Sequence, residues 1–101
     1  MVSTEAKRAA ARAAGADDVF LTGDDWPAQV QAATAGRGAD VVYDSVGATL
    51  PDSFSTTRQG GRVVFYGLAG GNPPLIDPRM LMDTSTTLTG GDLWNVLISA
   101  E

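Results

Sequence analysis

The residues best suited to chemistry in this sequence include a lysine close to the N-terminus. Lys7 comes four residues after Ser3, at the start of a stretch rich in helix-forming residues. A hydroxyl group, an ammonium group and the free backbone N–H groups of a helix start could together hold a phosphate monoester. For Arg8 and Arg12 on the same stretch we favour the simpler interpretation of a solvated helix face.

Small and polar residues also follow three short apolar runs. They occupy residues 22–23 (TG), 44–47 (DSVG) and 67–71 (GLAGG). In an open parallel sheet, ligands bind beyond the carboxyl ends of the strands, and glycine lets a backbone approach a ligand closely. Ordinary strand-to-helix turns need glycine as well, and on the residues alone that interpretation is the default.

Several kinds of chemistry are excluded by what the sequence lacks. There is no Cys and no His, which excludes thiolate nucleophiles, imidazole acid–base catalysis and Cys/His zinc sites. Neither G-x-G-x-x-G nor a G-x-x-x-x-G-K-[ST] phosphate loop occurs, and Gly36 and Gly38 follow a predicted helix, the wrong context for a dinucleotide fingerprint. Tyr43, Tyr66 and Trp26 are predicted to be packing residues rather than catalytic ones.

The elements that must position these residues alternate between helix and strand. Helices are predicted over residues 5–14, 26–35, 49–59 and 79–82, with a last one after Asp92. Strands are predicted over residues 19–21, 39–43, 62–66 and 86–89. This alternation predicts an α/β fold with a mostly parallel sheet of about four strands and flanking helices.

The composition fits one small globular domain. The chain has 101 residues, 44% of them hydrophobic and 19% charged, and a formal net charge of −5. An acidic chain is not expected to bind nucleic acid or an anionic membrane surface. The sequence has no apolar run long enough to span a membrane and no apolar core of a signal peptide at residues 1–10, so we expect a cytoplasmic location.

Three segments carry a resemblance to a known family. They are VSTEAKRAAARAAGADDVF at residues 2–20, GRGADVVYDSVG at residues 36–47 and GGRVVFYGLAGG at residues 60–71. In wording and spacing the chain resembles, over residues 2–97, the cofactor-binding domain of medium-chain dehydrogenases/reductases of the zinc-independent NADPH:quinone oxidoreductase type. The resemblance implies a truncated Rossmann-like fold, with residues 1–101 forming a single partial NAD(P)-binding domain.

The resemblance also implies a cofactor and the residues that meet it. The cofactor is NADPH, with NADH possible, and the family delivers hydride to a quinone, an enone or a similar acceptor. Ser3 and Lys7 stand where the family meets the adenosine ribose and its 2′-phosphate, so that Lys7 would favour NADPH. Residues 44–47 stand at the nicotinamide ribose, and residues 66–68 at the nicotinamide. The predicted cofactor-binding residues are Ser3, Lys7, Asp44, Ser45, Val46, Gly47, Tyr66, Gly67 and Leu68, and no catalytic residue or metal ligand is predicted.

The chain departs from the family pattern in ways that bear on function. The first strand, the glycine-rich turn and the first helix of the family's nucleotide domain are missing, and so is its catalytic domain. Thr22 replaces a tyrosine that often contacts the 2′-phosphate, and Gly90 and Gly91 replace a frequent Arg-Pro pair. We therefore expect a partial cofactor-binding domain that is inactive alone. The alternatives are a non-catalytic self-associating module that keeps the fold, and a small adenosine- or phosphate-binding protein.

The missing elements also predict self-association. In the strand order 3-2-1-4-5-6, two strands are expected between residues 19–21 and 39–43, and their loss leaves a gap on the order of 10 Å. Exposed strand edges invite a partner, and the family pairs its last strand across a dimer axis. The resemblance thus implies a homodimer through residues 86–89, with a nicotinamide dinucleotide as the other partner.

Overall fold

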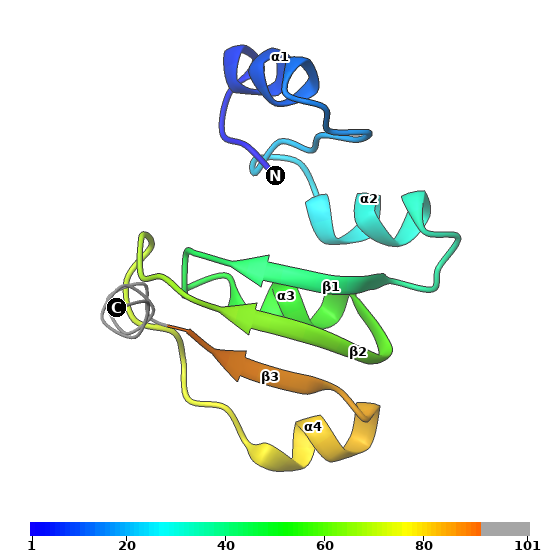
Figure 1. The fold of residues 1–101 in the computed structure, drawn as a ribbon, viewed down its shortest axis with the longest axis vertical. Coiled ribbons are helices and arrows are strands. Elements are labelled where there is room, and N and C mark those ends of the chain that lie inside the picture. Colours follow the sequence, from blue (N-terminus) through cyan, green and yellow to red (C-terminus); the bar gives the residue numbers. More distant parts are fainter. Residues whose placement is uncertain (92–101) are drawn as a thin grey trace, which may run out of the picture.

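The fold was analysed in a computed structural model that describes residues 1–91. The helix predicted after Asp92 lies outside the described residues. Helices and strands alternate from α2 onward, as the sequence predicts (Figure 1). The elements are α1 (Glu5–Ala13), α2 (Trp26–Ala33), β1 (Ala39–Asp44), α3 (Leu50–Thr56), β2 (Thr57–Phe65), α4 (Pro78–Thr84) and β3 (Thr87–Gly90).

Three of the helices begin where the sequence places a capping side chain. The Thr4 hydroxyl accepts a hydrogen bond from the Lys7 backbone N–H, 3.2 Å away, at the start of α1. Asp25 and Asp77 cap α2 and α4 in the same way, and each is followed by a proline in the first helical turn. These bonds satisfy N–H groups that have no partner within the helix, so the starts of these helices are determined locally.

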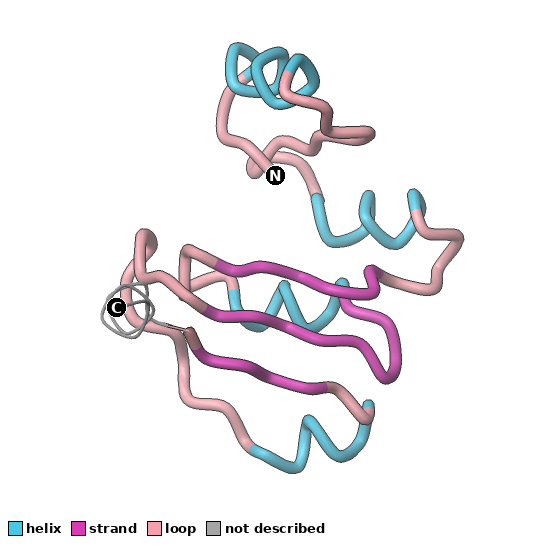
Figure 2. The backbone as a smooth tube through the Cα atoms, viewed as in Figure 1, coloured by secondary structure: helices cyan, strands magenta, loops and turns pink. Residues whose placement is uncertain are grey.

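The sheet has three parallel strands in the order β1-β2-β3, with β2 in the centre. The helix α3 contacts β1 and β2 and covers one face of the sheet (Figures 1 and 2). Val63 of β2 and Leu50 of α3 are fully buried at this contact. They form the centre of a small core, and among residues 1–91 the other buried hydrophobic side chain is Val19.

The opposite face of the sheet is open, which corrects one prediction. Tyr43 and Tyr66 were expected to be core residues, but 69% and 50% of their surfaces are exposed. Val41, on the same face as Tyr43, is 46% exposed. No helix of the described residues packs on this face, so the two tyrosine rings contact each other edge to face, with their centroids 6.5 Å apart.

The strand predicted at residues 19–21 is reduced to a single parallel bridge between Val2 and Leu21. Its hydrogen bonds run from the Val2 N–H to the Phe20 carbonyl and from the Thr22 N–H to the Val2 carbonyl, each 2.8 Å long. Val2 thus occupies the place of one of the two strands predicted to be missing.

The junction of α3 and β2 also differs from the prediction. The helix was predicted to run to residue 59 and the strand to begin at residue 62, yet β2 begins at Thr57 and includes Gly60 and Gly61. The pairing of β1 with β2 shifts register between Ala39 and Val41 at this point. A Cβ atom on Gly61 would lie 2.6 Å from the Thr57 side chain, so glycine is needed where the strand bends.

Among residues 1–91, no helix has the length and apolar character needed to cross a membrane.

Candidate functional site

The carboxyl ends of β1 and β2 meet at one edge of the sheet and continue into two loops. Residues 45–49 form the first strand-end loop and residues 66–71 form the second. Three consecutive carbonyl groups, those of Asp44, Ser45 and Val46, accept hydrogen bonds from backbone N–H groups of the second loop. The donors are Tyr66, Ala69 and Gly70, at 3.0, 3.1 and 2.8 Å. The two loops are therefore joined backbone to backbone.

Glycine residues make this close approach possible. A Cβ atom on Gly67 would lie 2.6 Å from the Ser45 carbonyl oxygen. Gly47 has a φ of +84°, and a Cβ atom there would lie 2.5 Å from the Gly71 carbonyl oxygen. A side chain at Gly67 or Gly47 would push the loops apart.

The Asp44 side chain holds the first loop in place through hydrogen bonds. Its side chain is 3% exposed, and its Oδ1 atom accepts hydrogen bonds from the backbone N–H groups of Val46 (2.8 Å) and Gly47 (2.9 Å). Its Oδ2 atom accepts hydrogen bonds from the hydroxyl groups of Thr49 (3.0 Å) and Ser53 (2.7 Å). Since a carboxylate has about four acceptor sites, this group is saturated by its own chain.

The charge of Asp44 is stabilised in spite of its burial. Desolvation would raise the pKa of this carboxyl group, but the hydrogen bonds from Ser53, Gly47, Val46 and Thr49 together hold its pKa below the ordinary value. Asp44 is thus an ionised group turned toward its own loop and α3. Both of its carboxylate oxygens accept hydrogen bonds from its own chain, so the side chain shapes the loop.

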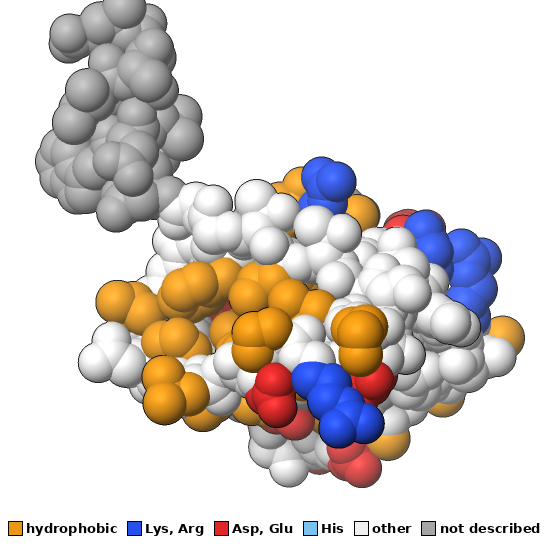
Figure 3. Space-filling view, turned by 90° about the horizontal axis from the view of Figure 1, so that it is seen from below, with side chains coloured by type: hydrophobic (Ala, Val, Ile, Leu, Met, Phe, Trp, Pro, Cys, Tyr) orange, Lys and Arg blue, Asp and Glu red, His pale blue; other side chains and the backbone are white. Residues whose placement is uncertain are grey.

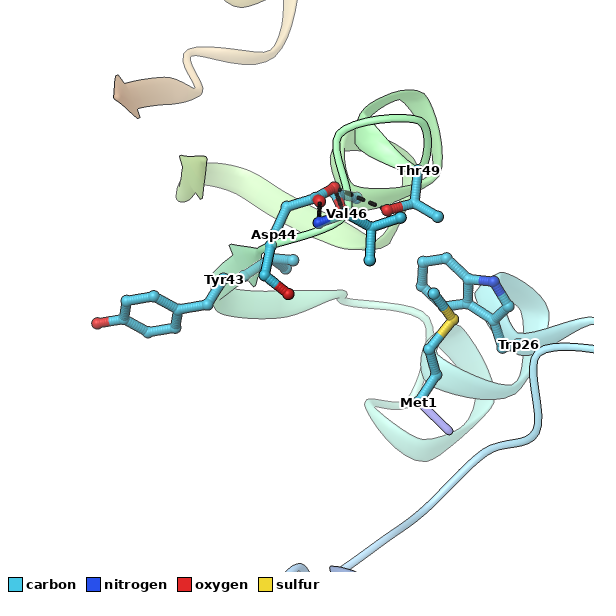
Figure 4. Close-up of a pocket in the computed structure, with 9 residues that line it drawn as sticks. Met1, Trp26, Tyr43, Asp44, Val46 and Thr49 are labelled. Atoms are coloured by element: carbon cyan, nitrogen blue, oxygen red, sulfur yellow. Dashed lines mark hydrogen bonds between the residues drawn. The ribbon is translucent and has the colours of Figure 1, made fainter. Parts of the chain in front are cut away.

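A cavity of about 190 Å³ opens beside the first loop. Figure 4 shows Met1 and Trp26 on one side of it and the loop on the other. It is lined by Met1, Trp26, Val42, Tyr43, Asp44, Ser45, Val46, Thr49 and Ser53. Nothing in the sequence signals that Met1 and Trp26 contribute, because they are distant along the chain and reach the loop only through the fold.

Ser3 and Lys7 form a second polar group, at the start of α1. The Lys7 ammonium group donates a hydrogen bond to the Ser3 hydroxyl at 3.0 Å, and both side chains are exposed. The donors here, a hydroxyl, a cation and the first N–H groups of a helix, match the chemistry of a phosphate. Met1, two residues before Ser3, lines the cavity beside the first loop, whereas Ser3 and Lys7 do not line it.

Comparison with known proteins places the chain in a family. Residues 1–95 match the family of zinc-binding dehydrogenases. The chain belongs to this family. The predicted resemblance to medium-chain dehydrogenases/reductases is thereby confirmed.

Curated relatives are reductases of which this chain spans only a part. It is 36% identical over 103 residues to a 2-haloacrylate reductase from Burkholderia sp, covering 95% of this chain and 30% of the relative. It is 41% identical over 70 residues to a probable quinone oxidoreductase from Schizosaccharomyces pombe, covering 68% of this chain and 21% of the relative. The chain therefore spans less than a third of the length of either relative.

Solved structures agree with the Rossmann-like fold. A quinone oxidoreductase from Pseudomonas syringae pv. Tomato DC3000 superposes with a TM-score of 0.86 at 31% identity, over 93% of this chain and 30% of the other. Mycobacterial Rv1454c complexed with NADPH gives a TM-score of 0.79 at 32% identity, over 92% of this chain and 31% of the other. The small parallel sheet with flanking helices is thus a Rossmann-like fold, as predicted.

The zinc in the family's name does not fit the residues of this chain. Catalytic and structural zinc sites use Cys, His and carboxylate ligands, and the sequence contains neither Cys nor His. Within residues 1–91, no three acidic side chains come together in a way that could hold a metal ion. The residues of this chain therefore do not fit a zinc site of the usual kind.

Proposed function

We propose that this chain is a partial cofactor-binding domain of an NAD(P)H-dependent oxidoreductase of the quinone or enone reductase kind. We also propose that it does not transfer hydride by itself. The observation that carries the proposal is the pair of strand-end loops, locked together at the carboxyl edge of a Rossmann-like sheet. Family membership and a related structure complexed with NADPH support it.

The proposed contacts fall into two groups. Ser3 and Lys7 receive the 2′-phosphate of the adenosine ribose, because their hydroxyl and ammonium groups already lie together at a helix start. Residues 45–47 receive the nicotinamide ribose, while Asp44 keeps their backbone in shape. Residues 66–68 pass the nicotinamide, where the absence of a side chain at Gly67 lets the two loops approach closely. When bound, the cofactor would supply the hydride.

The size of the cavity supports the proposal of inactivity. Pockets that bury a small ligand measure about 300–1,000 Å³, whereas the cavity beside the first loop measures about 190 Å³. Hydride transfer needs the nicotinamide and the acceptor to be held in a near-attack geometry. The sequence also lacks the G-x-G-x-x-G turn that cradles a pyrophosphate, so we propose that residues 1–101 form only part of the domain.

A calorimetric titration of NADPH and NADH into the chain tests the proposal. We expect NADPH to bind, and Lys7→Ala to weaken NADPH about tenfold while leaving NADH unchanged, because one charge-assisted contact to the 2′-phosphate is lost. Arg12→Ala, which removes a cation from the last turn of the same helix, is the matched control and should change neither affinity. An absence of NADPH binding at millimolar concentration refutes the proposal.

The alternative, a non-catalytic self-associating module, has its own support in the structure. The strand β3 forms one end of the sheet, so its outer backbone groups have no strand partner among residues 1–91. Hydrophobic side chains gather on the face near α4 (Figure 3), and Leu75 and Met82 are strongly exposed. We propose a homodimer through β3. From the sequence alone, we also propose a cytoplasmic location.

Light scattering on the chain after size-exclusion chromatography tests the dimer. Lysine on an edge strand blocks edge-to-edge pairing, so we expect Thr89→Lys to convert a dimer into a monomer. Asp52→Lys, an exposed substitution on α3, adds a lysine away from β3 and should leave the dimer intact. A wild-type monomer at high concentration refutes the proposed dimer.

A further inference from the structure

The hydroxyl groups of Thr49, which precedes α3, and of Ser53, inside it, both point to the Asp44 carboxylate. Thr49 is the N-cap residue of α3, yet its side chain makes no capping hydrogen bond. Its hydroxyl instead donates to Asp44 at 3.0 Å. Ser53, one turn later, is 3% exposed and donates to the same carboxylate oxygen at 2.7 Å. Thr49 has φ −88° and ψ 4° rather than the extended backbone of a side-chain cap, which leaves its hydroxyl free to reach Asp44.

These contacts belong to a continuous series of hydrogen bonds that runs from α3 across the carboxyl ends of β1 and β2. It begins at the two hydroxyl groups of α3 and passes through the Asp44 carboxylate to the N–H groups of Val46 and Gly47. The carbonyls of residues 44–46 then accept hydrogen bonds from the second loop. The conformation of both loops thus depends on how the carboxylate is held.

We propose that Ser53 and Thr49 are positioning residues that set the shape of both strand-end loops through the Asp44 carboxylate. In consequence, α3 determines how well this edge receives the nicotinamide end of a dinucleotide. That the ligand is a dinucleotide rests on the proposed function, whereas the effect of Ser53 and Thr49 on the loops does not depend on it.

Ser53 is the more informative of the two residues because it is buried and its hydrogen bond is the shortest of the four to Asp44. Ser53→Ala removes the hydroxyl with little change in volume and leaves Oδ2 with Thr49 as its remaining partner. A hydrogen bond to a charged acceptor is among the stronger ones in proteins. We therefore expect the open state of the first loop to become about tenfold more populated.

Amide hydrogen exchange, measured by NMR on the full chain, tests the effect on the loops. In Ser53→Ala, exchange should accelerate about tenfold at Val46 and Gly47, and also at Gly70 in the second loop. Ser55→Ala is the matched control, because the exposed Ser55 hydroxyl donates only to the Asp52 carbonyl of the same helix. Unchanged exchange at the two loops in Ser53→Ala overturns the proposal.

Thr49 offers a test that separates the hydroxyl from the shape of the side chain. Thr49→Val keeps the shape and removes the hydroxyl, whereas Thr49→Ser keeps the hydroxyl. We expect faster exchange at Val46 and Gly47 in the valine variant and recovery toward the wild-type rate in the serine variant. Equal exchange in both variants would show that packing rather than the hydrogen bond holds the loop, and would overturn the role of Thr49.

Two fragment probes separate this inference from the proposed function. Nicotinamide mononucleotide reports on the strand-end loops, and adenosine 2′-monophosphate reports on Ser3 and Lys7. We expect Ser53→Ala to weaken the first probe about tenfold and to leave the second unchanged, with Lys7→Ala showing the reverse. If Ser53→Ala abolishes binding of both fragments, the variant is generally unfolded and the positioning role of Ser53 is overturned. If the wild-type chain binds neither probe, the proposed function fails, and hydrogen exchange still decides whether α3 holds the loops.

Discussion

Gly67→Ala is the most direct test of the close contact between the two strand-end loops. The added Cβ atom would lie 2.6 Å from the Ser45 carbonyl oxygen and 3.1 Å from the Ser45 carbonyl carbon and Cα atom. All three are backbone atoms, so no side chain can rotate away to make room. Gly67 does not have a positive φ, which means that the cost of the substitution is steric and not conformational.

The magnitude follows from what must move. The carbonyl oxygen would have to retreat from 2.6 Å to the ordinary contact range of 3.4–4 Å. That oxygen accepts the hydrogen bond from Ala69 at 3.1 Å, and the neighbouring bonds to Tyr66 and Gly70 are tied to the same backbone. Overpacking at a tight contact costs about 1–3 kcal/mol, and replacing glycine returns about 0.4–1 kcal/mol by restricting the unfolded chain. We expect a net loss of roughly 1–2 kcal/mol in the free energy of unfolding.

Urea unfolding followed by circular dichroism measures this loss. Gly90→Ala is the matched control, because a Cβ atom there meets nothing within 4 Å and Gly90 has no positive φ. It should be neutral or stabilising by about 0.4–1 kcal/mol. A Gly67→Ala variant as stable as Gly90→Ala would refute the reasoning, since it would mean that the loops are not in backbone contact.

Two further predictions concern stability. The folded-state pKa of Asp44 lies below its ordinary value of 3.8, so its ionised form contributes stability above that pH, and the contribution is lost as the pH falls through the folded-state pKa. Urea unfolding should therefore show wild type more stable than Asp44→Asn at pH 7, with the difference shrinking toward pH 2. An unchanged difference would contradict the pKa shift. Val63 has no exposed surface, and Val63→Ala should cost about 2 kcal/mol or more in thermal or urea unfolding. Val41, 46% exposed on the open face, is its control, and Val41→Ala should cost less than about 1 kcal/mol.

Much of the fold could be predicted because the signals are local. Thr4, Asp25 and Asp77 cap helices through hydrogen bonds to residues two or three positions away. A short stretch of sequence is therefore enough to predict each of these caps. The alternation of helices with apolar strands predicted the parallel sheet. The two strand-end loops could be located for the same reason, since small residues after a buried strand mark its carboxyl end.

The errors arose where a residue's environment depends on distant parts of the chain. Tyr43 looks like a core residue within an apolar run, yet it is exposed because no described helix packs on its face of the sheet. The strand at residues 19–21 was predicted from its composition. A strand needs a neighbour, however, and among residues 1–91 the one bridge to this segment comes from Val2. Gly60 and Gly61 look like a helix end, yet they accommodate a bend in β2.

The sequence by itself determined the order of helices and strands from α2 onward, the family and the two loops at the carboxyl edge of the sheet. Only the tertiary structure decided that the Asp44 carboxylate is saturated by Ser53, Thr49 and its own loop, and that Met1 and Trp26 close a cavity beside it. Propensities and caps act over a few residues, whereas hydrogen-bond saturation and burial depend on which segments the fold brings together.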